Sequence, residues 1–310
     1  MAPFGRITAA FLIALAAFVF VGAALAVAGR QLPVPAIGRD YVTRSELPPA
    51  AGFDLPDVAG ETDDDRPLVV IDPGHGGHDP GASGQGLVEK TLVLELAREL
   101  RDELVRQGGL RVALTRDDDT YLLLEERSEI ARRLDADLFI SIHADSAGEA
   151  AEVAGASIYT LSNDASSEAA RRFAERENAA DRINGQLLAG QGENVSAILV
   201  ELSQRRTQGR SDELARLIER EGKGVLPFHP QPRRSAALRV LRAPDVPSIL
   251  YESGFITNES EAERLSSPEG RRRFAEVLAR AIRIYFARSG ELGTGTGSAA
   301  APANGTATGE

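Results

Sequence analysis

The stretch 68–81 constrains this chain more than any other, because an apolar run stops abruptly there in a loop rich in glycine and proline. The run Leu68–Ile71 is typical of a buried strand, and the proline and glycine that follow it end the strand. The loop holds His75, and Glu89 stands at the head of the next periodic segment. A strand end and a helix start can therefore present two metal ligands to one point.

Strand and helix patterns alternate along the rest of the chain. From Glu89 onward, apolar residues recur at helical spacing, which places one face of a helix on a core. Further helices are expected at 122–134 and 258–288, and further strands at 110–115, 138–142, 155–161, 238–241 and 248–252. The alternation indicates an α/β fold: a single domain over residues 67–289, with a twisted, mostly parallel sheet flanked by helices. In such sheets, ligand sites collect at the carboxyl ends of the strands.

Two more polar residues end predicted strands, His143 and Glu252. Zinc in hydrolases is commonly held by three protein ligands, often two histidines and one carboxylate, and the ion keeps a position for water. The metal lowers the pKa of that water to about 7, and a nearby carboxylate accepts its proton. Each residue alone has a structural reading, as a hydrogen-bonded histidine, a helix-terminal charge or an ion-pair partner. Their joint placement favours a metal site with Glu252 as the base.

Three motifs make the resemblance to a known family specific. They are DPGHGG at 72–77, SIHAD at 141–145 and ESGF at 252–255. Over roughly residues 66–288, the chain resembles the zinc-dependent N-acetylmuramoyl-L-alanine amidases of the Amidase_3 type. The resemblance implies one Zn²⁺ per chain, held by His75, Glu89 and His143, with Glu252 as the catalytic residue. It also implies hydrolysis of the amide bond between N-acetylmuramic acid and L-alanine in peptidoglycan.

Two other functions stay open on the residues alone. A zinc peptidase or deacetylase acting on another cell-wall amide would use the same ligands. A non-catalytic peptidoglycan-binding protein would hold the metal only for structure. Structural zinc sites are usually closed by four ligands, often cysteines, and this chain has no cysteine. The retention of Glu252 beside a complete ligand set argues further for an enzyme.

The span between residues 161 and 238 shows no strand pattern, and a span of that length needs its own structure or a function. We expect residues 163–222 to form a helical insertion, with a polar helix at 166–183 and an amphipathic helix at 194–206. The apolar residues of 214–217 are expected to pack on the domain.

Part of this insertion, 174–185, resembles the regulatory insertion of Gram-negative cell-division amidases. That resemblance implies septal wall splitting for cell separation, and a helix that lies over the zinc cleft and adds a glutamate to the metal. By position the autoinhibitory ligand is Glu177, with Glu193 and Glu201 as the fallback candidates. The resemblance also implies a LytM-type activator protein, and the dock expected for it is 194–206.

The two ends of the chain are predicted to lie outside the fold. Residues 1–28 are typical of a signal peptide or an N-terminal membrane anchor, residues 29–66 of a linker, and residues 290–310 of a disordered tail. We therefore expect an exported, periplasmic monomer that contacts the membrane only through its N-terminal segment. The formal net charge of −11 argues against nucleic acid as a partner.

Other charged and polar residues have weaker functional readings. The arginines Arg116, Arg127 and Arg239 are candidates for contact with an anionic wall fragment, although isolated arginines near strand ends are more often helix or loop charges. His78 is a candidate for supporting the metal ligands, and His229 is expected in a loop.

Overall fold

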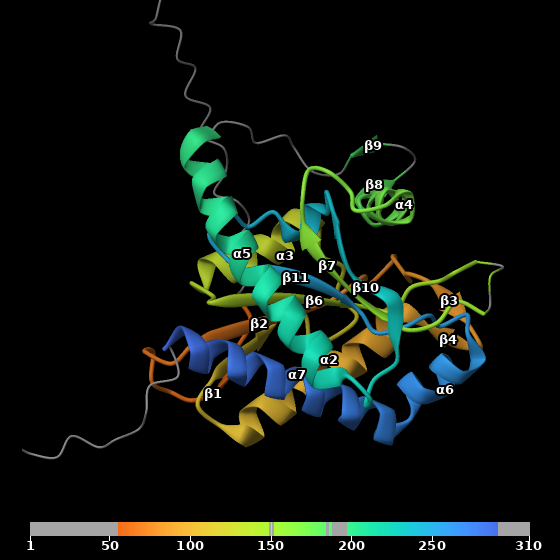
Figure 1. Cartoon of the computed structure of the whole chain (residues 1–310), viewed down its shortest axis with the longest axis horizontal. Helices are drawn as coiled ribbons and strands as arrows, with labels where there is room; N and C mark the ends of the chain where they lie inside the picture. The colour runs from red at the N-terminus through yellow and green to blue at the C-terminus, as the bar shows by residue number, and fades with distance from the viewer. Residues whose placement is uncertain (1–54, 149, 151, 184–185, 188–196, 291–310) are drawn as a thin grey trace, which may run out of the picture. The chain divides into compact units, whose positions relative to one another are not determined.

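A mostly parallel sheet forms the centre of the protein. The computed structural model describes residues 55–148, 150, 152–183, 186–187 and 197–290. Within these ranges, seven strands form the main sheet in the order β1-β5-β2-β6-β11-β7-β10 (Figure 1). Their bounds are β1 Val58–Gly60, β2 Leu68–Pro73, β5 Arg111–Leu114, β6 Leu138–His143, β7 Ala156–Leu161, β10 Phe228–Ala236 and β11 Ser248–Glu252. The central strands β5, β2, β6 and β11 run parallel, whereas β7 is antiparallel to β11 and β1 to β5. The predicted α/β fold is thus confirmed.

Helices cover both faces of this sheet. On one face lie α2 Glu89–Gln107, α5 Ala197–Gly222 and α7 Pro268–Ser289; the other carries α3 Leu124–Arg133, α4 Glu168–Glu177 and the 3₁₀ helix η1 Arg239–Leu241 (Figure 1). Successive side chains of a strand point to opposite faces of the sheet, so each strand contributes residues to the packing on both faces. In β2, Val69 and Ile71 pack under α2, whereas Leu68 and Val70 pack on the α3 side.

The C-terminal helices begin where the sequence predicts. The side chain of Asn258 accepts a hydrogen bond at the start of α6, Glu259–Ser266, and Ser267 does the same for α7, with Pro268 in its first turn.

Two short hairpins complete the described chain: β3 Ser83–Gly84 with β4 Leu87–Val88, and β8 Arg182–Ile183 with β9 Gln186–Leu187. Across the part of the chain that the structure describes, none of the helices combines the length and the apolar character that spanning a membrane requires.

Two strand predictions are wrong at one end of the sheet. The segment 238–241 is not a strand, because Arg239–Leu241 forms η1. The strand at this place is β10, in a segment expected to contain none. Pro230 and Pro232 conceal it, since proline cannot donate to a strand ladder and is confined to edges and irregular positions. β10 is such an edge strand and shows a register irregularity between Phe228 and Arg233.

The folded sheet also starts earlier than residue 67, the predicted boundary. β1, Val58–Gly60, lies within the range expected to be a linker, and it pairs with β5 at the other edge of the sheet. Three mostly exposed residues carry too short a pattern to be recognised in the sequence.

The helices of the predicted insertion have different bounds. The helix expected over 166–183 ends at Glu177, and the one expected over 194–206 is part of the 26-residue helix α5. Leu214 and Ile218 of α5 are fully buried in the main core, so the later half of this helix belongs to the domain as predicted for 214–217.

Candidate active site

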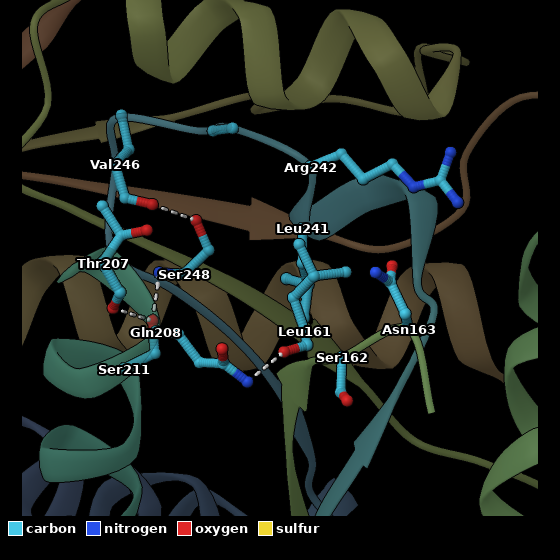
Figure 2. A pocket seen from close by; sticks show the side chains of 11 residues that line it. Leu161, Ser162, Asn163, Thr207, Gln208, Ser211, Leu241, Arg242, Val246 and Ser248 are labelled. Carbon is cyan, nitrogen blue, oxygen red and sulfur yellow. Dashed lines mark hydrogen bonds between the residues drawn. The ribbon is translucent and has the colours of Figure 1, made fainter. Parts of the chain in front are cut away.

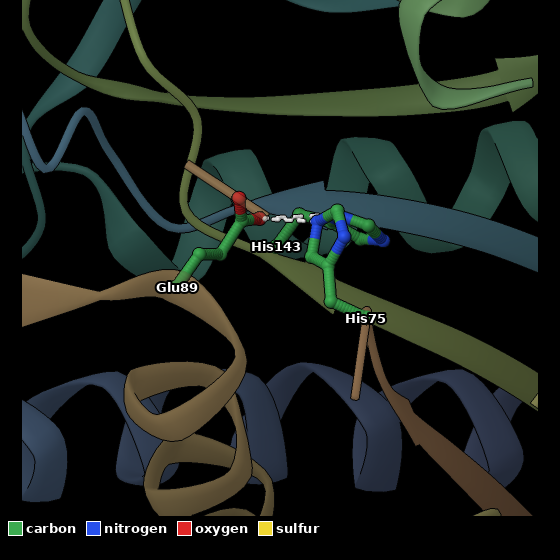
Figure 3. A group of neighbouring side chains, drawn as sticks. All are labelled: His75, Glu89 and His143. Carbon is green, nitrogen blue, oxygen red and sulfur yellow. Dashed lines mark hydrogen bonds and ion pairs between the residues drawn. The ribbon is translucent and has the colours of Figure 1, made fainter. Parts of the chain in front are cut away.

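Three side chains from distant parts of the sequence converge at the carboxyl edge of the sheet. His75 follows β2, His143 ends β6, and Glu89 is the first residue of α2 (Figure 3). One oxygen of Glu89, Oε1, lies 3.1 Å from His75 Nε2 and 3.1 Å from His143 Nδ1. One potential ligand atom from each residue lies within 4.8 Å of the others, so the group could hold a metal ion.

The donor set fits a cation better than it fits hydrogen bonding. His75 Nε2 is buried without a hydrogen-bond partner, and such an orphan atom requires an explanation. Burial alone lowers the pKa of His75, but Glu89 and Asp79 raise it well above the ordinary value. The pKa of Glu89 falls well below its ordinary value because the two histidines outweigh its burial. The negative charge that favours a protonated His75 would equally favour a metal ion, and zinc accepts two imidazoles and a carboxylate.

The backbone around His75 is unusual and tightly held. His75 has a φ of 60°, a region that non-glycine residues rarely adopt. Arg127 donates to the carbonyl oxygen of His75 at 2.7 Å, and Arg116 donates to that of Gly74 at 2.6 Å. A Cβ at Gly74 would lie 2.5 Å from the His143 ring, so only glycine allows the two histidines to approach.

Glu89 is fixed by backbone donors as well as by the histidines. Its Oε2 accepts a hydrogen bond from the N–H of Ala82 at 2.7 Å, and its Oε1 accepts one from the N–H of Ala144 at 2.9 Å. Both carboxylate oxygens are therefore oriented before any metal binds, as a preorganised site requires.

Glu252 lies next to this group on the same face of the sheet. In the pairing of β11 with β6, Glu252 lies opposite His143. Paired residues on neighbouring parallel strands point to the same face of a sheet. The Asp145 N–H donates to Glu252 Oε2 at 3.0 Å, while Oε1 is buried without a partner. Burial, together with the carboxylates of Asp145 and Glu89, raises the pKa of Glu252 well above its ordinary value. A carboxyl group whose pKa is raised holds a proton more readily than an exposed one, which suits it to general acid–base chemistry.

Helix α4 reaches over the cleft with its last two residues. Glu177 Oε2 lies 3.5 Å from His143 Nδ1 and 3.9 Å from His75 Nε2. Arg176 Nη2 donates to Asp145 Oδ1 at 2.6 Å. Burial raises the pKa of Asp145 to about 6. The structure therefore brings Glu177 to the other candidate ligands. The first fallback, Glu193, lies outside the described residues, as does the side chain of Glu201.

Some residues of this region were not identified in the sequence. Asp79, not His78, supports a ligand: its Oδ2 lies 2.8 Å from His75 Nδ1. His78 instead packs on the ring of Tyr121 at 4.1 Å between centroids. The only sequence signal for Asp79 is its position four residues after His75, whereas the pairing of Asp145 with Arg176 depends on the insertion folding back.

The three arginines weighed for substrate contact have structural partners instead. Arg116 and Arg127 are buried under the His75 loop, where Arg127 also pairs with Asp72 at 2.9 Å. Arg239 pairs with Glu125 on α3 at 2.7 Å. His229 contacts Arg234 within the edge strand β10 rather than a loop.

A second cavity, of about 360 Å³, opens at the other end of the sheet (Figure 2). It lies where β7 ends and β11 begins, beside the start of the later half of α5. Its walls are hydroxyl, amide and apolar groups together with the side chain of Arg242, and Ser211 accepts a hydrogen bond there from the N–H of Ser248 at 2.9 Å. Among the described residues that line it, there is no carboxylate and no histidine. The acid–base groups collect at the opposite edge.

Acid–base groups beside a potential metal site at the carboxyl edge of an α/β sheet are typical of the active site of an enzyme. Comparison with known proteins then identifies the kind of enzyme. Residues 69–283 match the family model of Amidase_3, N-acetylmuramoyl-L-alanine amidase. The N-acetylmuramoyl-L-alanine amidase AmiA of Escherichia coli K12 is 40% identical over 221 residues, which cover 71% of this chain and 76% of that protein. AmiC of Escherichia coli O6:H1 is 35% identical over 268 residues, which cover 84% of this chain and 63% of that protein.

A solved structure agrees with these relatives. The amidase AmiC2 of Nostoc punctiforme superposes with a TM-score of 0.52 at 30% identity, covering 72% of this chain and 98% of the other. The chain therefore belongs to the N-acetylmuramoyl-L-alanine amidase family, and its activity is hydrolysis of the amide between N-acetylmuramic acid and L-alanine in peptidoglycan. The family resemblance expected from the motifs is confirmed, and the alternatives of a peptidase, a deacetylase or a non-catalytic binding protein are set aside.

Proposed function

We propose that this amidase depends on zinc, that His75, Glu89 and His143 hold the ion, and that Glu252 is the catalytic acid–base residue. One observation carries the proposal: the three ligand atoms converge on a buried point beside Glu252, where His75 Nε2 lies 3.1 Å from Glu89 Oε1 but makes no hydrogen bond. When bound, zinc would polarise the scissile carbonyl and lower the pKa of a water molecule. Glu252 then accepts a proton at its carboxylate and delivers it to the leaving nitrogen.

Hydrolysis of purified sacculi tests this proposal. Digestion by the zinc-loaded chain should release dye-labelled fragments together with free stem peptides that begin at L-alanine, as identified by mass. Glu252→Gln should lower the rate by about 10²–10⁴-fold, the usual contribution of general acid–base catalysis. Glu263→Gln, an exposed change on α6, is the matched control. Equal rates for both variants, or full activity after chelation of zinc, would refute the assignment.

We further propose that α4 inhibits the enzyme through Glu177. A carboxylate in the open position of the metal takes the place of the attacking water. Support comes from Glu177 Oε2, which lies within 4 Å of both candidate histidine ligands. Glu177→Ala should therefore raise basal hydrolysis, whereas Glu175→Ala, on the exposed side of the same helix, should leave it unchanged. Unchanged hydrolysis in Glu177→Ala would contradict autoinhibition by this residue.

The cellular role is proposed on the same family resemblance. Export to the periplasm, a monomeric enzyme and a part in septal wall splitting during cell division all remain proposals, as does the signal peptide or anchor at 1–28, which lies outside the described residues.

A LytM-type activator would dock on 194–206, of which 197–206 begins α5. Charged substitutions at Ile198 and Leu202 should abolish activator binding in a pull-down, and intact binding would exclude this dock.

A further inference from the structure

Asp145 differs from Asp79 and Glu89 in its binding partner, because the partner of Asp145 is an arginine on helix α4. The cleft has a volume of about 500 Å³, and α4 forms one wall of it. Asp79 contacts His75, and Glu89 contacts both histidines, so these two carboxylates have their partners among the residues of the candidate metal site itself. Asp145 is paired with Arg176, a residue of α4, and its other side-chain contact is the N–H of Ser146.

Arg176 connects the two inhibitory contacts of α4. Its Nη2 is 2.6 Å from Asp145, and its Nε is 3.5 Å from Glu177 Oε1. Withdrawal of Glu177 from the histidines therefore also withdraws the guanidinium from Asp145. The Asp145 side chain is only 14% exposed, and a shielded carboxylate without a cation is unfavourable. An open cleft would thus present a carboxylate that favours a new cation.

The reaction produces a cation close to this position. The oxygen of water bonds to the lactyl carbonyl carbon, the carbon–nitrogen bond breaks, and the products are a carboxylate and the amino terminus of the stem peptide. An α-amino group has a pKa of about 7.7–8.0, so at neutral pH it takes up a proton and becomes an ammonium. The nitrogen leaves beside Glu252, whose Oε2 accepts the backbone N–H of Asp145. The new ammonium therefore emerges next to Asp145.

We propose that Asp145 is the ammonium-binding residue of the cleft, which holds the amino terminus of the released stem peptide, and that Arg176 occupies this position while α4 covers the site. The inference rests on the proposed function, because it takes Glu252 as the proton donor and α4 as a removable cover. Helix α4 then imitates the product complex twice, with the carboxylate of Glu177 at the metal ligands and the guanidinium of Arg176 at the ammonium site.

Peptide binding, rather than hydrolysis, tests the inference. The whole chain with Arg176→Ala is titrated in a calorimeter with L-Ala-γ-D-Glu-L-Lys, with the same peptide acetylated at its amino terminus, and with the peptide acetylated on the lysine amine. We expect the free peptide to bind at least about tenfold more tightly than the N-terminally acetylated one, with the lysine-acetylated form close to the free peptide. Arg172→Ala, an exposed change on α4 that pairs with Glu168 alone, is the control and should bind the free peptide no better than the parent.

Adding Asp145→Asn to the Arg176→Ala chain should reduce the preference for the free amino terminus to less than about twofold. A preference that survives Asp145→Asn, one that follows the lysine amine, or no peptide binding to Arg176→Ala would overturn the inference. Loss of the proposed reaction is a separate result: a Glu252→Gln, Arg176→Ala chain that hydrolyses nothing yet still prefers the free amine retains Asp145 as the binding residue.

Discussion

The loop after β2 and the helix α4 both reach the same cleft, but they are held there in different ways. The loop is fixed from beneath by Arg127, which is buried against the fully buried Asp72 and donates to the carbonyl oxygens of Pro73, at the end of β2, and His75, in the loop. Helix α4 is held at its end by Asn178, which exchanges hydrogen bonds with the backbone of Ala237 and Arg239, and by the half-exposed Arg176.

This difference separates a permanent part of the site from the part that the proposed autoinhibition requires to be removable. Breaking a buried ion pair costs about 3–5 kcal/mol, because one charge is left uncompensated, whereas an exposed pair contributes about 0–1 kcal/mol. The position of His75 is therefore built into the folded domain, while the end of α4 is held over the cleft by the half-exposed Arg176 and by the hydrogen bonds of Asn178. The following four experiments test that contrast.

The largest effect is expected from Arg127→Ala. The change leaves Asp72 buried without its cation, so the free energy of unfolding should fall by about 3–5 kcal/mol in a denaturant titration. Arg132→Ala is the control on the same helix, because its pairs with Glu129 and Asp245 are about half exposed and should contribute at most about 1 kcal/mol. Equal losses in the two variants would mean that the loop is not specially anchored.

Low pH should weaken the ion pair between Arg127 and Asp72 and so lower the free energy of unfolding. Burial alone raises the pKa of Asp72, but Arg127 and the hydroxyls of Thr115 and Ser141 lower it below the ordinary value. A carboxyl with a lower pKa in the folded state stabilises the fold above its unfolded pKa, near 3.9, and this contribution disappears as pH falls through the folded pKa. The parent should therefore lose more stability than Asp72→Asn between pH 5 and pH 2, with each unit of pKa difference worth about 1.4 kcal/mol. Parallel pH profiles would contradict this.

A smaller effect is expected from Phe173→Leu in α4, which keeps a large apolar side chain at this buried position but removes the aromatic ring. Phe173 stacks on Tyr159 of β7 with 4.4 Å between centroids, and such a pair contributes about 0.5–1.5 kcal/mol beyond the burial of its area. Its loss should speed hydrogen exchange of α4 amides by up to about tenfold, measured by mass spectrometry, while amides of β2 keep their protection. If β2 loses protection to the same degree, α4 and the sheet open as one unit.

The smallest effect compares one capping interaction in two helices. Ser167 accepts a hydrogen bond at the start of α4, and Ser267 does so at the start of α7; replacing such a cap costs about 1 kcal/mol. Ser267→Ala should lower the global free energy of unfolding by that amount, because α7 is part of the main core. Ser167→Ala should change only the exchange rates of α4. Equal global losses would show that α4 unfolds together with the domain.

The sequence predicts the permanent part of the molecule well, because periodicity and local motifs determine it. The apolar run Leu68–Ile71, the helix from Glu89 and the strand ends at His143 and Glu252 all lie where expected. Each of these rests on residues adjacent in the chain. The side chain of Glu177 was placed near the site by resemblance, and the structure brings it there, although its role as a zinc ligand stays a prediction.

The features that the sequence did not reveal depend on long-range contacts. Nothing near Arg127 in the sequence indicates that it pairs with Asp72, 55 residues away. The hydrophobic pattern likewise does not predict the contact between Asp145 and Arg176. Prolines conceal β10, whose pairing with β7 becomes visible only in the sheet.

β10 also bears on how copies of the protein behave at high concentration. The open edge of a sheet is a template on which a second chain can add a strand and begin to aggregate. β10 forms such an edge. Pro230 and Pro232 offer no N–H group to an incoming strand, and the neighbouring Arg233 and Arg234 place positive charge along the same stretch. The residues that disguise this strand in the sequence therefore also make it a poor template for self-association.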